Sequence, residues 1–158
     1  MDLKYKVSVE KKPILIGLTG GIASGKSTII QYLIYKGYPV IDADKLGHKV
    51  LEPGNPGYSK VVRKFGESIL NKDKTVNRLI LGGIVFSDPS KLKTLNDISH
   101  PIIAEMVLKK FKSIVSSDSK GIVFLEAALL IEANWYNMCH HIWVVNLEAA
   151  EARRRLQK

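Results

Sequence analysis

The sequence predicts a three-layer α/β protein, in which a central parallel sheet lies between helices and carries a helical insert. Two observations predict this class. Short apolar runs without polar alternation, typical of strands buried on both faces, occur in both halves of the chain. A long stretch of helical patterns separates them, as expected when parallel strands are joined by crossovers. We expect an N-terminal extension at residues 1–12 and one domain at 13–158, with the insert at about 57–116.

The first predicted strand runs from Pro13 to Leu18, with the sequence PILIGL. It is apolar and shows no alternation, so we expect it to be buried. After a glycine-rich turn we predict a helix that ends before Gly37, because glycine is common just past a helix C-terminus. Four apolar residues recur in this helix at helical spacing: Ile29, Ile30, Leu33 and Ile34.

The turn between this strand and helix carries the pattern Gly20-x-x-x-x-Gly25-Lys26-Ser27. This pattern is typical of P-loop NTPases, in which backbone N–H groups and a helix N-terminus face phosphate oxygens. A side chain at either glycine would obstruct a positive φ or the approach of the phosphates. Lys26 is expected to contact the terminal phosphates and to take part in catalysis, and Ser27 to ligate Mg²⁺. The predicted nucleotide-binding residues are Gly20, Gly21, Ile22, Ala23, Ser24, Gly25, Lys26, Ser27 and Thr28.

The composition narrows the class of ligand. The chain has 158 residues, of which 46% are hydrophobic, and its 24 basic and 15 acidic residues give a net charge of +9. The lysines are scattered rather than interleaved with aromatic residues, which favours a small phosphate-rich ligand over nucleic acid.

No apolar run approaches the ~20 residues of a membrane span, and the first twelve residues lack the apolar region of a signal peptide. We therefore expect no nucleic-acid partner, no membrane span and a cytoplasmic location, with mitochondrial association left open. The single cysteine, Cys139, excludes an internal disulfide.

Acidic residues follow two further predicted strands. Asp42 and Asp44 come after a strand from Tyr38 to Ile41, and Glu126 follows a strand from Ile122 to Leu125. Ligands of open parallel sheets bind at the carboxyl ends of the strands, so we expect these carboxylates on the same rim as the phosphate loop. Glu126 could hold Mg²⁺ through water, or it could be an ordinary strand-terminal acid.

Between these strands the chain reads as a loop followed by helices. The Pro and Gly cluster from Leu51 to Ser59 predicts the loop, and helical patterns run from Tyr58 to Ser116 with stops at Gly66 and at His100-Pro101. The dipeptide Asp88-Pro89 predicts an N-cap followed by the first helical position. We interpret this insert as a cover over the substrate.

The last part of the chain predicts a strand from His141 to Asn146 and a helix from Leu147 into the C-terminus. Leu129 and Leu130 are expected in the core or in a pocket wall. The neighbouring Cys139, His140 and His141 raise the question of zinc, but no second ligand pair is visible, and we interpret them as structural.

The motifs favour phosphoryl transfer over hydrolysis. The base-reading NKxD motif of G proteins is absent, whereas Asp42-Ala43-Asp44 offers a carboxylate where an acceptor hydroxyl could lie. Positioning and charge neutralisation carry most of the catalysis of such a transfer. These residues therefore predict a kinase. The alternatives are a nucleotide-binding module without efficient turnover and a kinase for another nucleotide-like small molecule.

Taken together, these residues resemble the dephospho-CoA kinase family, which phosphorylates the ribose 3′-hydroxyl of dephospho-CoA with ATP in the last step of coenzyme A biosynthesis. The resemblance rests on segments in family order from Ile14 onward: GLTGGIASGKST, VIDADKLGH, EPGNPGY, FGESIL, VNRLILGGIVF, HPII and ALLIEANW. The form EAALLIEANWYN is similar to the kinase domain of the bifunctional CoA synthase of animals.

The resemblance implies dephospho-CoA as substrate, ATP and Mg²⁺ as cofactors, and fusion to or association with a phosphopantetheine adenylyltransferase. It implies that Asp44 is the general base and that Asp42 helps to shape the acceptor pocket. Arg78 and His100 match positions near the CoA substrate, although Arg78 could be a surface residue and His100 could cap a helix. The family also has a lid with arginines and further C-terminal elements. We expect these to be lacking in this chain, which ends shortly after Arg153-Arg154-Arg155.

Overall fold

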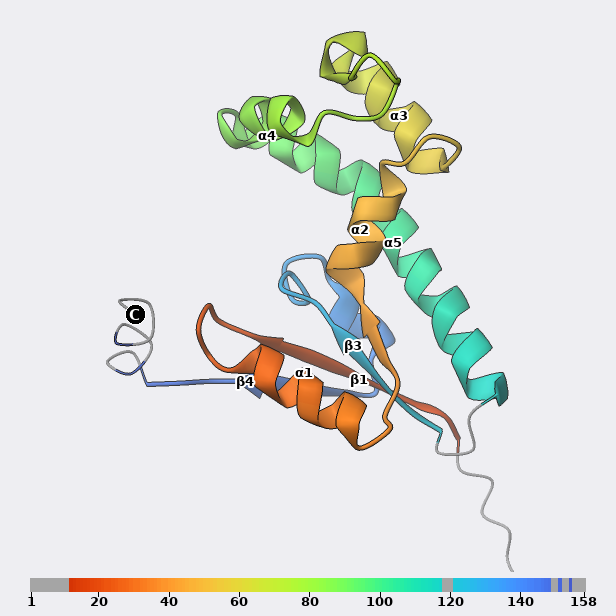
Figure 1. The fold of residues 1–158 in the computed structure, drawn as a ribbon, viewed down its shortest axis with the longest axis vertical. Coiled ribbons are helices and arrows are strands. Elements are labelled where there is room, and N and C mark those ends of the chain that lie inside the picture. Colours follow the sequence, from red (N-terminus) through yellow and green to blue (C-terminus); the bar gives the residue numbers. More distant parts are fainter. Residues whose placement is uncertain (1–11, 118–120, 149–150, 152–153, 155–158) are drawn as a thin grey trace, which may run out of the picture.

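The computed structural model describes residues 12–117, 121–148, 151 and 154 (Figure 1). Its strands and helices are β1 (Ile14–Gly20), α1 (Lys26–Tyr35), β2 (Val40–Asp42), α2 (Ala43–Val50), α3 (Pro56–Phe65), α4 (Arg78–Phe86), α5 (Pro89–Ser117), β3 (Ile122–Glu126) and β4 (His141–Val145). Two short 3₁₀ turns, η1 (Glu67–Ile69) and η2 (Trp135–Met138), complete the order. Among the described helices, none combines the length and apolarity needed to cross a membrane.

The strands form one parallel sheet in the order β2-β3-β1-β4. Glu126 pairs with Asp42 on one side and with Leu18 on the other, so β2, β3 and β1 reach the same edge of the sheet at the same level. The five central residues of β1 are buried, as expected for a strand covered on both faces. The predicted central parallel sheet is confirmed.

Helices cover the two faces of the sheet. On one face α1 packs Ile30 and Leu33 against β1 and β3, and Figure 1 shows this helix on the near side of the sheet. On the other face α2 and α5 enclose the larger core cluster, in which Val107 is fully buried. Ile34, predicted on the apolar face of α1, is 57% exposed because it lies at the margin of the buried stripe.

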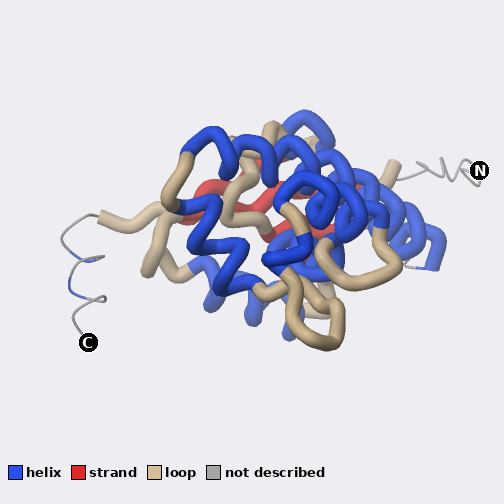
Figure 2. Tube along the Cα trace, turned by 90° about the horizontal axis from the view of Figure 1, so that it is seen from above, coloured by secondary structure: helices blue, strands red, loops and turns tan. Residues whose placement is uncertain are grey.

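The helical insert has a small core of its own. α3, α4 and the first half of α5 meet around buried Val61, Ile69, Leu81 and Val85. In Figure 1 these helices rise above the sheet, and Figure 2 looks down on them with the red strands beneath. The insert therefore overhangs the edge of the sheet where the strands end.

The predicted helix stop at His100-Pro101 is wrong, because α5 continues through Pro101 from Pro89 to Ser117. Proline removes one backbone N–H and strains the preceding turn, at a cost of about 3 kcal/mol in a helix interior. Packing of the α5 segments before and after Pro101 offsets this cost. Leu92 and Leu95 pack against the core of the insert, while Ile103 and Val107 are buried against the sheet.

Other boundaries differ from the prediction near α2 and α3. The segment after β2 forms the eight-residue α2, which the sequence analysis did not predict. The loop expected from Leu51 to Ser59 ends earlier, because Pro56 takes the first position of α3, where its missing N–H costs nothing. Asp88 accepts from the backbone N–H of Ser90 ahead of α5, as predicted for an N-cap. The helix expected from Leu147 lies, beyond residue 148, largely outside the described residues.

Candidate active site

The glycine-rich loop joins the end of β1 to the start of α1. Gly25 is the N-cap of α1 with φ +94°, and Ala23 also has a positive φ of +61°. Gly25 has no side chain to cap the helix, and the first turn of α1 holds no acidic residue. The positive N-terminus of α1 is therefore available to an anion, as the sequence predicted.

Gly20 is required for a reason that differs from the predicted one. A Cβ at this position would lie 2.5 Å from the carbonyl oxygen of Val145 and 2.9 Å from Ser24 Oγ. The close approach that the structure shows at Gly20 is thus between the loop and β4, and Gly20 has no left-handed φ. At Gly21, by contrast, a Cβ would meet nothing within 4 Å.

A cavity of about 390 Å³ opens over this loop and is called here the phosphate-loop cavity. Ser24 Oγ is buried beside it and has no hydrogen-bond partner in the described part of the chain. A buried hydroxyl without a partner is unfavourable unless a ligand completes it. Ser27 and Thr28, at the start of α1, are exposed. The cavity is lined by Gly20, Gly21, Ile22, Ala23, Ser24, Gly25, Lys26, Ser27 and Ala128.

Lys26, which lines this cavity, forms an ion pair with Glu126 at the end of β3. Lys26 Nζ lies 3.3 Å from Glu126 Oε1, and the two side chains are only 15% and 18% exposed. A pair shielded to this degree interacts more strongly than a pair on the open surface. The acid at the end of β3, expected on the same rim as the phosphate loop, thus contacts the lysine of that loop, a contact that the sequence did not predict.

Asp42 acts as the N-cap of α2. Its Oδ1 accepts from the backbone N–H of Lys45 at 2.9 Å, and its Oδ2 lies 3.1 Å from Lys45 Nζ. Burial alone would raise the pKa of Asp42, but the hydrogen bonds and the charge of Lys45 outweigh it and hold the pKa below its ordinary value. The carboxylate predicted to shape an acceptor pocket thus orients the helix that follows it.

Asp44 lies in the first turn of that helix and is exposed. Its carboxylate makes no hydrogen bond or ion pair with any residue that the structure describes. Asp42 lies opposite Glu126 in the strand register of β2 and β3, and Asp44 follows two residues later. The Asp44 carboxylate therefore lies at the edge of the sheet that carries the Lys26–Glu126 ion pair.

Arg78 and His100 line a second cavity, of about 750 Å³, between the insert and the sheet. They do not line the phosphate-loop cavity. We call this the insert cavity; its other lining residues are His48, Leu51, Leu81, Gly82, Val85, Phe86, Leu92, Leu95, Asn96, Leu129 and Glu132. The predicted pocket-wall role of Leu129 is confirmed, while Leu130 is fully buried in the core.

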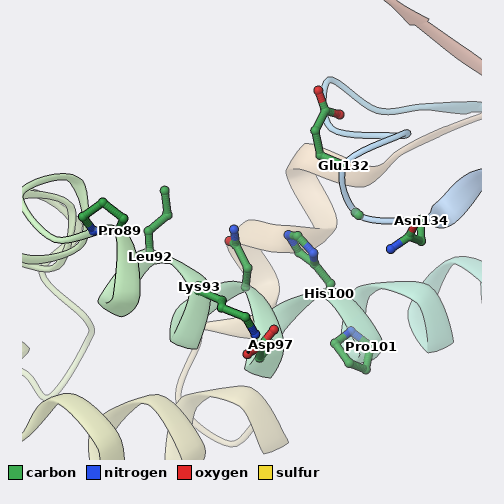
Figure 3. A pocket seen from close by; sticks show the side chains of 10 residues that line it. Pro89, Leu92, Lys93, Asp97, His100, Pro101, Glu132 and Asn134 are labelled. Atoms are coloured by element: carbon green, nitrogen blue, oxygen red, sulfur yellow. Dashed lines mark hydrogen bonds and ion pairs between the residues drawn. The ribbon is translucent and has the colours of Figure 1, made fainter.

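His100 lies at the junction of the insert cavity with a neighbouring groove. Figure 3 shows it on α5, facing the loop that carries Glu132 and Asn134. Its ring contacts the Trp135 ring edge-on at 5.4 Å, and Trp135 Nε1 donates to its carbonyl oxygen at 3.2 Å. Burial lowers the pKa of His100, and the charge of Asp97 opposes this only in part. His100 is inside α5, so the capping role left open by the sequence does not apply.

Several lining residues of the insert cavity were not identified from the sequence. His48 was detectable in principle, because it follows Asp44 by four residues and therefore shares its face of α2. Asn96 and Glu132 carried no such signal, since they come from α5 and from the loop after β3.

The structural interpretation of Cys139 and its histidine neighbours is supported by their contacts. His140 Nδ1 accepts from the backbone N–H of Leu15 at 3.0 Å, and the Cys139 thiol lies 3.6 Å from the carbonyl oxygen of Trp135. Burial raises the pKa of Cys139 to about 11. The described residues hold no group of three or more metal-binding side chains.

Comparison with known proteins identifies the family. The sequence model of the family described as dephospho-CoA kinase matches residues 14–158. The dephospho-CoA kinase of Shouchella clausii is 44% identical over 141 residues, covering 89% of this chain and 71% of the relative. That of Carboxydothermus hydrogenoformans is 44% identical over 142 residues, covering 90% and 68%.

Solved structures agree with this result. The crystal structure of TT1252 from Thermus thermophilus superposes with a TM-score of 0.76 at 34% identity, covering 93% of this chain and 72% of that one. The dephospho-CoA kinase from Campylobacter jejuni superposes with a TM-score of 0.64 at 29% identity, covering 90% and 78%. The fold is thus of the P-loop NTPase type, and the chain belongs to the dephospho-CoA kinase family.

Proposed function

We propose that this protein transfers the γ-phosphoryl group of ATP to the ribose 3′-hydroxyl of dephospho-CoA, giving CoA and ADP in the last step of coenzyme A biosynthesis. Family membership supports the reaction. The observation that carries its assignment to these residues is the convergence of three features at one edge of the sheet. These are the uncapped N-terminus of α1, the Lys26–Glu126 pair, and the helix that presents Asp44.

The phosphates of ATP would lie in the phosphate-loop cavity, against the N-terminus of α1. Lys26 would exchange Glu126 for the terminal phosphates and neutralise the charge that develops there. Ser27 and Glu126 supply hydroxyl and carboxylate oxygens, which suit Mg²⁺. A Mg²⁺ ion held by them would neutralise charge on the β- and γ-phosphates.

Asp44 would act as general base. As the 3′-oxygen forms its bond to the γ-phosphorus, the Asp44 carboxylate accepts the hydroxyl proton, and the bond between the γ-phosphorus and the bridging oxygen of ADP breaks. Among the residues that the structure describes, this carboxylate has no competing partner, which supports the role. Asp42 would act indirectly, because it caps the helix on which Asp44 lies.

The proposal is tested by incubating the protein with ATP, Mg²⁺ and dephospho-CoA and measuring CoA, with ATP affinity measured in parallel by calorimetry. Lys26→Ala should weaken ATP binding by about tenfold or more, the loss expected for a charge-assisted contact. The control is Lys36→Ala, which changes an exposed lysine at the other end of the same helix. ATP binding without formation of CoA would indicate a nucleotide-binding module. Equal ATP affinity in the Lys26→Ala and Lys36→Ala variants would contradict the assignment of the phosphate loop. Association with a phosphopantetheine adenylyltransferase and a cytoplasmic location stay predictions from the sequence.

A further inference from the structure

Helix α5 belongs to two separate cores. Its first half, with Leu92 and Leu95, packs together with α3 and α4 in the core of the insert. Its second half, with Ile103 and Val107, packs against the sheet. The chain joins the insert to the rest of the protein only through this helix and through the short loop 51–55 before α3. The position of the insert over the sheet therefore depends in part on how the two halves of α5 are joined.

The two halves meet at Pro101, where α5 lacks one of its internal hydrogen bonds. Proline has no N–H to donate to the carbonyl four residues earlier, here that of Asp97, and its ring crowds that turn. The packing is also open at this point. His100 lines the insert cavity and two neighbouring grooves of about 500 and 360 Å³, both of which Pro101 also lines (Figure 3). The junction therefore has fewer restraints than a regular, closely packed stretch of helix.

Trp135 supplies a restraint at this junction. Its Nε1 donates to the carbonyl oxygen of His100, the residue just before the proline, at 3.2 Å. Its ring also contacts the His100 ring edge-on at 5.4 Å between centroids. Trp135 is only 5% exposed, so little water can compete with the indole for this carbonyl.

Trp135 is itself fixed to the body of the sheet. Its backbone N–H donates to the carbonyl oxygen of Leu130 at 3.0 Å, and its own carbonyl oxygen lies 3.6 Å from the Cys139 thiol. The loop that carries Trp135 begins after Glu126, the ion-pair partner of the loop lysine, and includes Ala128, which lines the phosphate-loop cavity. The indole thus links the junction in α5 to the loop that borders the nucleotide side.

We propose that Trp135 is a positioning residue for phosphoryl transfer. Its hydrogen bond to the His100 carbonyl fixes the junction in α5 and so holds the insert in its working position above the edge of the sheet. Trp135 lines neither the phosphate-loop cavity nor the insert cavity, so it acts through the helix and not on a reactant. This inference rests on the proposed function.

The expected consequence of losing this bond is selective. The insert would then occupy its working position for only a fraction of the time, and the apparent affinity for the acceptor falls by that fraction. A bound acceptor restores the position, so turnover at saturation is retained. ATP affinity is retained as well, because the phosphate loop and α1 lie outside the insert.

The two tryptophans of the chain allow a matched test. Trp143, on β4, is 47% exposed and contacts the Phe124 ring at 5.2 Å, and its indole makes no hydrogen bond with the residues that the structure describes. Trp135→Phe and Trp143→Phe therefore make the same chemical change, and only Trp135→Phe removes a bond to α5.

The first measurement is steady-state kinetics of CoA formation, well below the Tm of each protein, with ATP affinity measured by calorimetry. Trp135→Phe should raise KM for dephospho-CoA about three- to tenfold, the range for one hydrogen bond, with kcat and ATP affinity little changed. Trp143→Phe should behave as the wild type. An unchanged KM in Trp135→Phe would overturn the proposal, and so would equal losses of ATP and acceptor affinity, which indicate general loosening of the fold.

The second measurement separates this inference from the proposed function, because it needs no turnover. Spin labels on Gln31→Cys of α1 and Lys60→Cys of α3, both exposed positions, report the distance between the sheet domain and the insert by pulsed electron paramagnetic resonance. Burial raises the pKa of Cys139 to about 11, so its thiol reacts slowly with the label at neutral pH. Without ligands, the distance distribution should be broader in Trp135→Phe than in the wild type and in Trp143→Phe, which should coincide.

The outcomes distinguish the two proposals. If CoA is never formed but the distance distribution broadens only in Trp135→Phe, the proposed function fails, while the control of the insert position by Trp135 stands. If CoA is formed but the three distributions coincide, the positioning role of Trp135 fails and the proposed function stands.

Discussion

The phosphate-loop cavity and the insert cavity lie at the same end of the sheet but are built in different ways. Eight of the nine lining residues of the first are consecutive, from Gly20 to Ser27, and its affinity for anions comes largely from backbone geometry. The second is lined by side chains from α2, α4, α5 and the loop after β3. A group common to all nucleotides can be bound by a local backbone turn, whereas selection of one acceptor requires side chains brought together by tertiary packing.

Their electrostatics differ as well. In the phosphate-loop cavity the lining cation, Lys26, is shielded and paired with Glu126. In the insert cavity Arg78 and Glu132 are the two charged lining residues, Arg78 is exposed, and the rest of the wall combines apolar side chains with His48, Asn96 and His100. We therefore expect substitutions near the first cavity to act on nucleotide binding and chemistry, and substitutions in the second to act on the acceptor.

The largest effect is expected at Asp44, in the first turn of α2. Asp44→Asn removes the base but keeps the size of the side chain, so turnover should fall by roughly 10²-fold or more. ATP affinity should change little, because the carboxylate lies outside the phosphate-loop lining. The control is Glu52→Gln, an exposed acid just after α2. Near-normal CoA formation by Asp44→Asn in a stopped-time assay would exclude the general-base role.

A smaller effect is expected at the glycines of the phosphate loop, and here it falls on folding stability. Gly20→Ala forces a Cβ against the carbonyl oxygen of Val145 and should lower the free energy of unfolding by about 1–3 kcal/mol. For a chain of this size, that lowers Tm by roughly 2–12 °C. A Cβ at Gly21 would make no such contact, so the Tm of Gly21→Ala should be close to that of the wild type. Thermal unfolding of the two variants decides the matter; equal Tm values would contradict the close packing of the loop on β4.

The ion pair predicts an effect on ATP affinity in the absence of Mg²⁺ and an effect on turnover in its presence. Without Mg²⁺, the Glu126 carboxylate competes with phosphate for Lys26, so Glu126→Gln should bind ATP about three- to tenfold more tightly in EDTA. With Mg²⁺ present, its turnover should fall. Glu132→Gln, which changes an acid of the insert cavity, should leave ATP affinity in EDTA unchanged. Weaker ATP binding by Glu126→Gln in EDTA, measured by calorimetry, would show that the two groups do not compete.

The smallest effect concerns pH and His100. Because burial lowers the pKa of His100 in the folded protein, the unfolded chain binds more protons as the pH falls below the ordinary value of about 6.5. Stability is therefore lost as the pH falls from about 7 through 6.5. Between pH 7.5 and 5.5 the wild type should lose roughly 1 °C more in Tm than His100→Gln, a small excess because the side chain is partly open to solvent. His48→Gln, an exposed histidine of the same cavity, serves as control; parallel Tm curves for wild type and His100→Gln would contradict the effect.

Much of the fold and half of the site could be predicted from local sequence. The buried strands were visible because a strand covered on both faces needs an unbroken apolar run. The phosphate loop was visible because a backbone cradle depends on glycine at set spacing. The sequence nevertheless did not reveal why position 20 must be glycine, because Val145, which a Cβ there would crowd, is distant in the chain.

The sequence by itself determined the nucleotide side of this protein: the strand, loop and helix from Ile14 to Tyr35, and the acids that end β2 and β3. Only the tertiary structure decided that Lys26 meets Glu126, that Asp42 caps α2, and that α5 continues through Pro101. It also decided which side chains from four elements enclose one cavity. The physical reason is the separation along the chain of the residues that interact. Backbone conformation and capping depend on residues a few positions apart, whereas ion pairs, helix continuity and cavity walls depend on packing between residues distant in the chain.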